Sequence, residues 1–168
     1  VGKYIRVSAS YTDDDGTVES HTDTHVVAVA NVNDDPTGSV TITGTPTQGQ
    51  TLTAANTLAD EDVLGTITYT WSNSATGATV VLAESDVGNA MTVTATYTDG
   101  HNTAESVASS ATAAVANVND APTGSVTITG TPTQGQTLTA ANTLADADGL
   151  GTITYTWSNS ATGATVVL

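Results

Sequence analysis

The chain has 168 residues, with 17 acidic side chains against 2 basic ones, 36 Thr and no Cys. The net charge of -15 argues against nucleic acid or an anionic membrane surface as a partner, because phosphate recognition needs Lys and Arg. The lack of Cys excludes a disulfide scaffold and thiolate metal sites. No apolar run approaches the roughly 18 to 20 residues that span a bilayer. Because no leader-like segment opens the sequence, we expect any secretion signal to lie outside it.

Alternation of apolar and polar residues, the period of a half-buried strand, runs through most of the chain. The predicted strands lie around residues 5–11, 40–42, 52–54, 65–71, 80–82, 91–98 and 104–115. Clusters of Gly, Pro, Asn and Asp mark turns at 44–49, 73–77 and 99–102. The β-branched Thr and Val suit a pleated surface, and no stretch has the period of an amphipathic helix. Short strands with frequent turns predict an all-β, antiparallel sandwich.

The sequence is internally repeated. Residues 31–82 recur as residues 117–168 with three changes, and the same offset of 86 residues aligns 1–34 with 87–120 at 17 identities. A unit of 86 residues, with about seven predicted strands, suits a small independent β-domain. We therefore expect further copies in a longer array.

Trp71 shares one face of its predicted strand with Ile67 and Tyr69. Its position in the middle of the unit matches the core Trp on strand C of an immunoglobulin sandwich. We predict that Trp71 and the Tyr residues belong to the core and do not form a ligand platform.

Several phrases together resemble the tandem immunoglobulin-like or cadherin-like repeats of giant bacterial RTX-type adhesins. They are Asn-Val-Asn-Asp-Asp-Pro-Thr-Gly (31–38), Ala-Asp-Ala-Asp-Gly-Leu-Gly (145–151), Tyr-Thr-Trp (69–71 and 155–157), Ser-Asp-Val-Gly (85–88) and Tyr-Thr-Asp-Asp-Asp-Gly-Thr (11–17). The resemblance implies immunoglobulin-like sandwiches in an extended rod. It also implies a secreted, calcium-dependent extender on the bacterial cell surface, which holds a distal adhesive domain away for attachment or biofilm formation.

Fourteen of the 17 acids fall in four loop types: the linkers between repeats, the loop before the Trp strand, and the loops before and after the Tyr strand. In stacked immunoglobulin-like domains these loops would converge at each junction, where like charges repel unless a cation binds. Ca²⁺ takes six to eight oxygen ligands in irregular geometry. Zinc is not expected, since there is no Cys and the three His residues form no joint site.

We predict Ca²⁺ as the cofactor, with its ligands at three junctions. The predicted ligands are Asn31, Asn33, Asp34, Asp60, Asp62 and Asp99 at one junction; Glu84, Asp86, Asn117, Asn119, Asp120, Asp146 and Asp148 at the next; and Asp13 and Asp15 at an upstream one. Asp35 and Glu61 are weaker candidates because Ala121 and Ala147 replace them in the second copy.

Two domain frames remain open. In the immunoglobulin frame, 1–34 holds the last strands of one repeat, 35–116 is a complete repeat, and 117–168 is a linker with the first strands of the next. In that frame the half-repeats of neighbouring molecules could complement one another in head-to-tail contacts. In the shifted frame, 1–82 and 87–168 are two units joined by 83–86.

The expected partners are neighbouring repeats of the same chain, with neither nucleic acid nor direct membrane insertion. An alternative function is a glycan- or ice-binding sandwich that uses its Thr-rich faces, such as Thr66, Thr68 and Thr70. An enzyme is not expected, although paired acids could serve glycoside hydrolysis, because the acids lie in metal-like turns.

Overall fold

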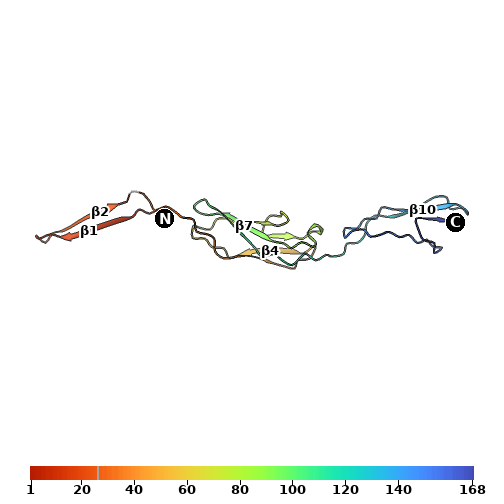
Figure 1. Cartoon of the computed structure of the whole chain (residues 1–168), viewed down its shortest axis with the longest axis horizontal. Coiled ribbons are helices and arrows are strands. Elements are labelled where there is room, and N and C mark those ends of the chain that lie inside the picture. The colour runs from red at the N-terminus through yellow and green to blue at the C-terminus, as the bar shows by residue number, and fades with distance from the viewer. Residues whose placement is uncertain (26) are drawn as a thin grey trace. The chain divides into compact units, whose positions relative to one another are not determined.

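The computed structural model describes residues 1–25 and 27–168, and in them the chain is all-β, as predicted (Figure 1). The strands are β1 (Arg6–Thr12), β2 (Val18–Thr24), β3 (Val40–Thr43), β4 (Thr51–Asn56), β5 (Thr68–Trp71), β6 (Thr79–Val81), β7 (Val93–Thr98), β8 (Ala104–Ala108), β9 (Val126–Thr129), β10 (Thr137–Asn142) and β11 (Thr165–Val167). One turn of 3₁₀-helix, η1 (Glu84–Asp86), lies between β6 and β7. No helix in this described part is long and apolar enough to cross a bilayer.

The strands form small antiparallel sheets with the orders β1-β2, β3-β4-β6, β5-β7-β8 and β11-β10-β9. The sequence repeat reappears in their bounds, because β9, β10 and β11 lie 86 residues after β3, β4 and β6. Their registers match as well: Leu52 pairs with Val80, and Leu138 with Val166.

The chain divides into two compact units. The first consists of Val1–Ile42, Ala54–Ala78 and Val93–Ser110. It contains the β1–β2 hairpin and the β5-β7-β8 sheet, in which Trp71 is paired with Val93. Trp71 is only 2% exposed, and its indole nitrogen donates a hydrogen bond to the Gly77 carbonyl at 2.9 Å. The predicted burial of Trp71 is therefore confirmed. Of the Tyr residues, Tyr97 is buried, but Tyr4 and Tyr11 are 60% and 66% exposed, so the prediction that the Tyr residues belong to the core is wrong for these two.

The second unit consists of Thr43–Thr53, Thr79–Thr92 and Ala111–Leu168. Leu52, Leu82 and Met91 are its largest fully buried side chains. Parallel bridges join Thr47 to Ala116 and Val87 to Val115, and the β9–β10–β11 sheet follows.

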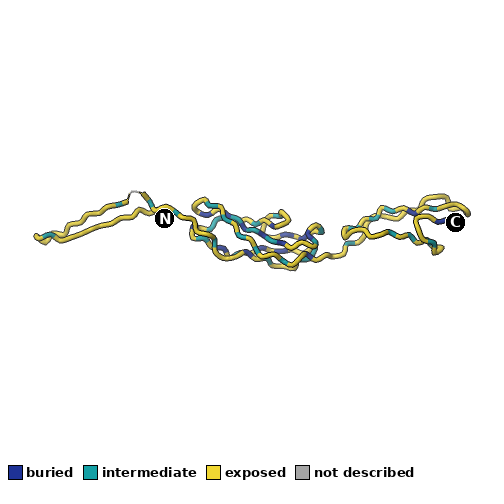
Figure 2. The backbone as a smooth tube through the Cα atoms, in the orientation of Figure 1, coloured by how far each residue is buried: buried dark blue, intermediate teal, exposed yellow. Residues whose placement is uncertain are grey.

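Burial alternates along β7, where Val93, Ala95 and Tyr97 are buried and the intervening Thr side chains are not. This is the pattern of a sheet with one apolar face. By contrast, β1 and β2 are exposed along almost their whole length (Figure 2).

The strand predicted over 104–115 is interrupted, because β8 ends at Ala108 and pairing resumes as isolated bridges at 114–116. Side-chain hydroxyls explain the interruption. The amide of Val93 donates to the Ser109 hydroxyl at 3.1 Å, and the amide of Met91 donates to the Thr112 hydroxyl at 3.0 Å. Each hydroxyl takes the place of a backbone carbonyl and offers the chain an alternative to the regular ladder.

Candidate metal centre

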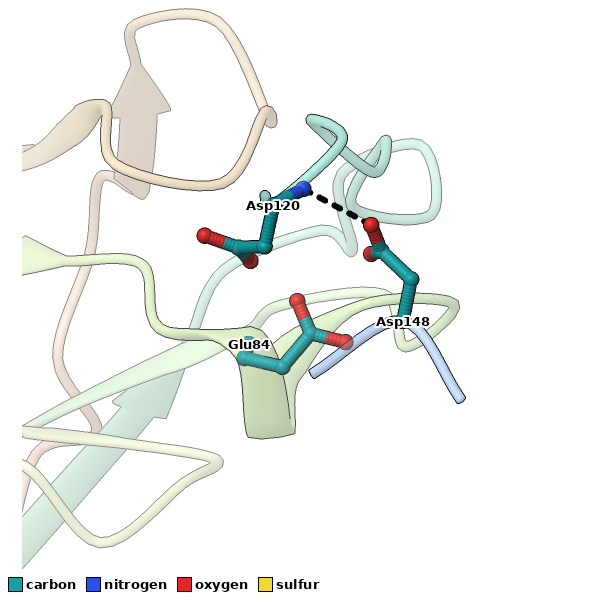
Figure 3. A group of neighbouring side chains, drawn as sticks. All are labelled: Glu84, Asp120 and Asp148. Atoms are coloured by element: carbon teal, nitrogen blue, oxygen red, sulfur yellow. Dashed lines mark hydrogen bonds between the residues drawn. The ribbon is translucent and has the colours of Figure 1, made fainter. Parts of the chain in front are cut away.

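Three carboxylates that are far apart in the sequence meet in the second unit. Glu84 comes from η1, Asp120 from the segment before β9, and Asp148 from the loop after β10 (Figure 3). One oxygen from each lies within 4.8 Å of one oxygen from each of the others. Two oxygens that bind the same Ca²⁺ at about 2.4 Å can be at most about 4.8 Å apart, so this spacing suits a shared ion.

Glu84 is the member of this group whose pKa is shifted. Burial, followed by the negative charges of Asp148 and then Asp120, raises the pKa of Glu84 above its ordinary value. The Glu84 Oε2 atom is buried and has no hydrogen-bond partner among residues 1–25 and 27–168. A buried acceptor without a partner is rare in folded proteins, and a hard cation would satisfy it.

Local hydrogen bonds order the backbone segments that carry the three carboxylates. The amide of Asp120 donates to Asp148 Oδ2 at 2.7 Å, and the amide of Asp148 donates to Asp146 Oδ1 at 3.0 Å. Beside Glu84, the Asp86 carboxylate is buried and accepts a bond from the amide of Ala83 at 2.9 Å, which closes the η1 turn. Asp86 and Asp146 therefore have defined structural bonds within the predicted ligand set.

Gln48 is a functional residue that the sequence reading missed. Its side-chain amide donates to Asp120 Oδ2 at 2.9 Å, and its side-chain carbonyl accepts from the amide of Val118 at 2.9 Å. Gln48 therefore fixes the linker that carries Asp120. The sequence placed Gln48 in a turn, and no local signal identifies a partner 70 residues away.

A second acidic group lies in the first unit, around Asp62 and Asp99, which are 3% and 6% exposed. Asp99 Oδ1 accepts bonds from the amides of His101 and Thr103, whereas Asp99 Oδ2 is buried without a partner in the part of the chain that the structure describes. Asp62 Oδ2 accepts from the amide of Asp34 at 2.8 Å.

The pKa of Asp62 is lowered, chiefly by the bond from the Asp34 amide, with burial opposing and Asn31 and His101 adding smaller effects. His101 Nδ1 lies 3.4 Å from Asp62 Oδ1. These donors make Asp62 a stable anion at neutral pH.

The bond between linker and loop is the same in both copies. Asp34 binds Asp62 as Asp120 binds Asp148, at an offset of 86 residues. Asp60 accepts a bond of another kind, from a side chain: its Oδ2 accepts from the Tyr97 hydroxyl at 2.5 Å. Burial, and next the bond to Asp60, raise the pKa of Tyr97.

No family model, no curated protein and no solved structure matches the chain. Function is therefore inferred from the geometry of these two acidic groups.

The remaining predicted ligands form other hydrogen bonds or are exposed. Asp13 Oδ1 caps the β1–β2 turn by accepting from the amides of Asp15 and Thr17. The Asn33 side chain binds Glu105, the Asn119 side chain binds the Asp120 carbonyl, and Asn117 is exposed.

The Thr side chains of the alternative ligand-binding face form hydrogen bonds with one another across neighbouring strands. The hydroxyls of Thr68 and Thr96, on neighbouring strands, lie 2.9 Å apart. Such cross-strand Thr pairs stabilise the solvated face of a sheet. A structural role accounts for them without a ligand.

Proposed function

We propose that the chain is part of an array of immunoglobulin-like extender repeats in a secreted bacterial adhesin, stiffened by Ca²⁺ at the repeat junctions. In this role the array is a non-enzymatic stalk that holds a distal adhesive domain away from the cell. The observation that carries the proposal is the meeting of Glu84, Asp120 and Asp148, with one Glu84 oxygen buried and without a partner.

The donor chemistry supports calcium among the common metals. The centre offers carboxylate oxygens, with neither Cys nor His in the group. Hard cations prefer such ligands, and Ca²⁺ accepts irregular cages more readily than Mg²⁺ does. Asp120 belongs to the segment between the two copies, so an ion shared with Glu84 and Asp148 would limit the bending of that segment.

The pairing of β7 supports the immunoglobulin frame, with 35–116 as a complete repeat. β7 pairs with β5 on one side and with β8 on the other. All three strands belong to residues 35–116.

Calcium binding to the native state alone would stabilise it by about 2.7 kcal/mol at a hundredfold excess over Kd. The test is a calcium titration of the full chain followed by calorimetry, thermal unfolding and small-angle scattering, with magnesium in parallel. We expect chelator to lower Tm and to shorten the maximum dimension of the particle. An unchanged Tm and scattering curve with and without calcium would refute the proposal.

Matched variants separate the site from general charge effects. The double variant Glu84→Gln with Asp148→Asn should abolish the calcium response. The control, Glu19→Gln with Asp23→Asn, removes the same charge from exposed positions on β2 and should keep that response. Binding of the isolated chain to a glycan array or to ice would instead favour the ligand-binding alternative.

A further inference from the structure

Gln48 lies in the turn between β3 and β4, and both ends of its side-chain amide form hydrogen bonds. Its Nε2 atom donates to Asp120 Oδ2 at 2.9 Å, and its Oε1 atom accepts from the amide of Val118 at 2.9 Å. The reverse orientation would set the side-chain NH₂ against the Val118 N–H and the side-chain oxygen against the carboxylate, so the partners fix the orientation of Gln48. Gln48 therefore binds one particular oxygen of one carboxylate of the centre.

The backbone of the same turn holds Gln48 in place. The amide of Gln48 donates to the Ala116 carbonyl at 2.9 Å, and the amide of Gly49 donates to the Leu82 carbonyl at 2.8 Å. Leu82 is 1% exposed and lies two residues before Glu84. This one turn is thus bonded both to the segment that leads into Glu84 and to the linker before β9.

The hydrogen bonds of the centre leave particular carboxylate oxygens for an ion. Oδ2 of Asp120 accepts from Gln48, and Oδ2 of Asp148 accepts from the amide of Asp120. These bonds leave Oδ1 of both aspartates for an ion. The buried Glu84 Oε2 atom accepts no hydrogen bond from residues 1–25 and 27–168. Bonds of this kind orient ligating carboxylates in metal sites and are part of what sets the affinity.

We propose that Gln48 is a positioning residue that makes this centre selective for Ca²⁺ over Mg²⁺, an inference that rests on the proposed function. By holding Oδ2, Gln48 makes Oδ1 the oxygen that Asp120 offers to the ion, together with oxygens of Glu84 and Asp148. Gln48 does not contact the ion and acts through Asp120.

The selectivity follows from how many carboxylates each ion uses. Ca²⁺ takes about six to eight oxygen ligands at about 2.3–2.6 Å, so it gains from all three carboxylates. Mg²⁺ requires near-ideal octahedral geometry at about 2.0–2.1 Å, keeps several waters and is usually bound through one or two carboxylates. Without the bond from Gln48, the Asp120 carboxylate is free to rotate, which weakens the calcium complex more than the magnesium complex.

The experiment is isothermal titration of the full chain with Ca²⁺ and with Mg²⁺, in the wild type and in Gln48→Met. Methionine has a similar length, but it cannot donate to Asp120 and is a poor acceptor for the Val118 amide. The double variant Glu84→Gln with Asp148→Asn identifies which part of the titration belongs to the centre. We expect the calcium affinity of the centre to fall about tenfold in Gln48→Met, and the magnesium affinity to fall less.

The matched control is Gln50→Met, which makes the same change at an exposed position of the same turn. This variant should keep both affinities. A calcium affinity that falls as far in Gln50→Met as in Gln48→Met would show that the turn, and not the bond to Asp120, is responsible, and it would overturn the proposal.

A second pair of titrations separates positioning from a purely structural role. Gln48→Met also loses the bond from the Val118 amide, which should lower Tm in chelator as well as in calcium. If Gln48 acts through Asp120, the tenfold loss of calcium affinity should disappear in an Asp120→Ala background, because no carboxylate is left to position. The same loss in both backgrounds contradicts the positioning role. If the Asp120→Ala centre binds too weakly to titrate, the ratio of calcium to magnesium affinity in Gln48→Met decides, and an unchanged ratio contradicts it.

The outcomes separate this inference from the proposed function. A wild-type chain that binds no calcium at the centre overturns both. Calcium binding that depends on Glu84 and Asp148 but has the same affinity and selectivity in Gln48→Met supports the proposed function and overturns the role of Gln48.

Discussion

Replacing Gly65 with Ala tests how tightly the β5-β7-β8 sheet is built. The added Cβ would lie 1.9 Å from the carbonyl oxygen of Thr98, a backbone atom that no side-chain rotation can move away. One of the two backbone segments must shift by more than about 1 Å to restore van der Waals contact, and overpacking of this kind costs about 1–3 kcal/mol. The smaller entropy of the unfolded Ala chain returns about 0.4–1 kcal/mol. We expect a net loss of about 1–2 kcal/mol.

Gly151→Ala is the matched control, since it makes the same change in the same local sequence with open space around the new Cβ. Only the unfolded-chain effect applies there, so this variant should be unchanged or slightly stabilised. The two variants should differ by the overpacking cost of about 1–3 kcal/mol, which corresponds to roughly 4 °C or more in Tm for a domain of this size. Thermal unfolding by circular dichroism at low protein concentration measures the difference. Equal Tm values for the two variants would refute the close approach of Gly65 to Thr98.

Three further predictions follow from the two acidic groups and the core. The pKa of Glu84 is raised in the folded state, so in chelator the stability should fall as the pH rises from the unfolded-state pKa to the folded-state pKa of Glu84. Glu84→Gln should flatten this pH dependence, and it should raise Tm in chelator but lower Tm in calcium. The control Glu19→Gln should have none of these effects. Trp71→Ala should cost about 3–5 kcal/mol in urea unfolding, and Trp157→Ala less, because Trp157 is less buried. Asp99→Asn should remove the negative charge of the carboxylate whose Oδ2 is buried without a partner in the described part of the chain. In chelator, where no cation balances that charge, this variant should have a higher Tm than the wild type. In isothermal titration it should bind fewer calcium ions. An unchanged calcium count for Asp99→Asn would show that Asp99 binds no ion.

Local pattern was enough to predict where most strands lie, since alternation is typical of a strand with one apolar face. It did not predict burial in β1, which alternates in the same way and is exposed on both faces. The burial of Trp71 and Tyr97 followed from the alternation. The repeat also made the strand bounds of β9, β10 and β11 predictable from those of the first copy.

Hydrogen bonds between distant residues were not predictable in this way. Nothing near Gln48 indicates Asp120 or Val118 as its partners, and nothing near Tyr97 indicates Asp60. The clustering of acids predicted which loops are charged. It could not separate Glu84, which has a buried oxygen without a partner, from Asp86, which closes a turn. That separation depends on backbone geometry, which composition does not encode.

The parallel pairing around Gln48 has a mechanical consequence. The amide of Gln48 donates to the Ala116 carbonyl, and the amide of Ala116 donates to the Pro46 carbonyl, both at 2.9 Å. The side chain of Gln48 adds its bonds to Val118 and Asp120. A pull on the chain beyond Asp120 would act along these two parallel segments, so it would have to shear several bonds at once, whereas a hairpin opens one bond at a time. None of these bonds is a salt bridge, so this resistance to tension should persist in brine or seawater, where screening weakens the attraction between exposed charges.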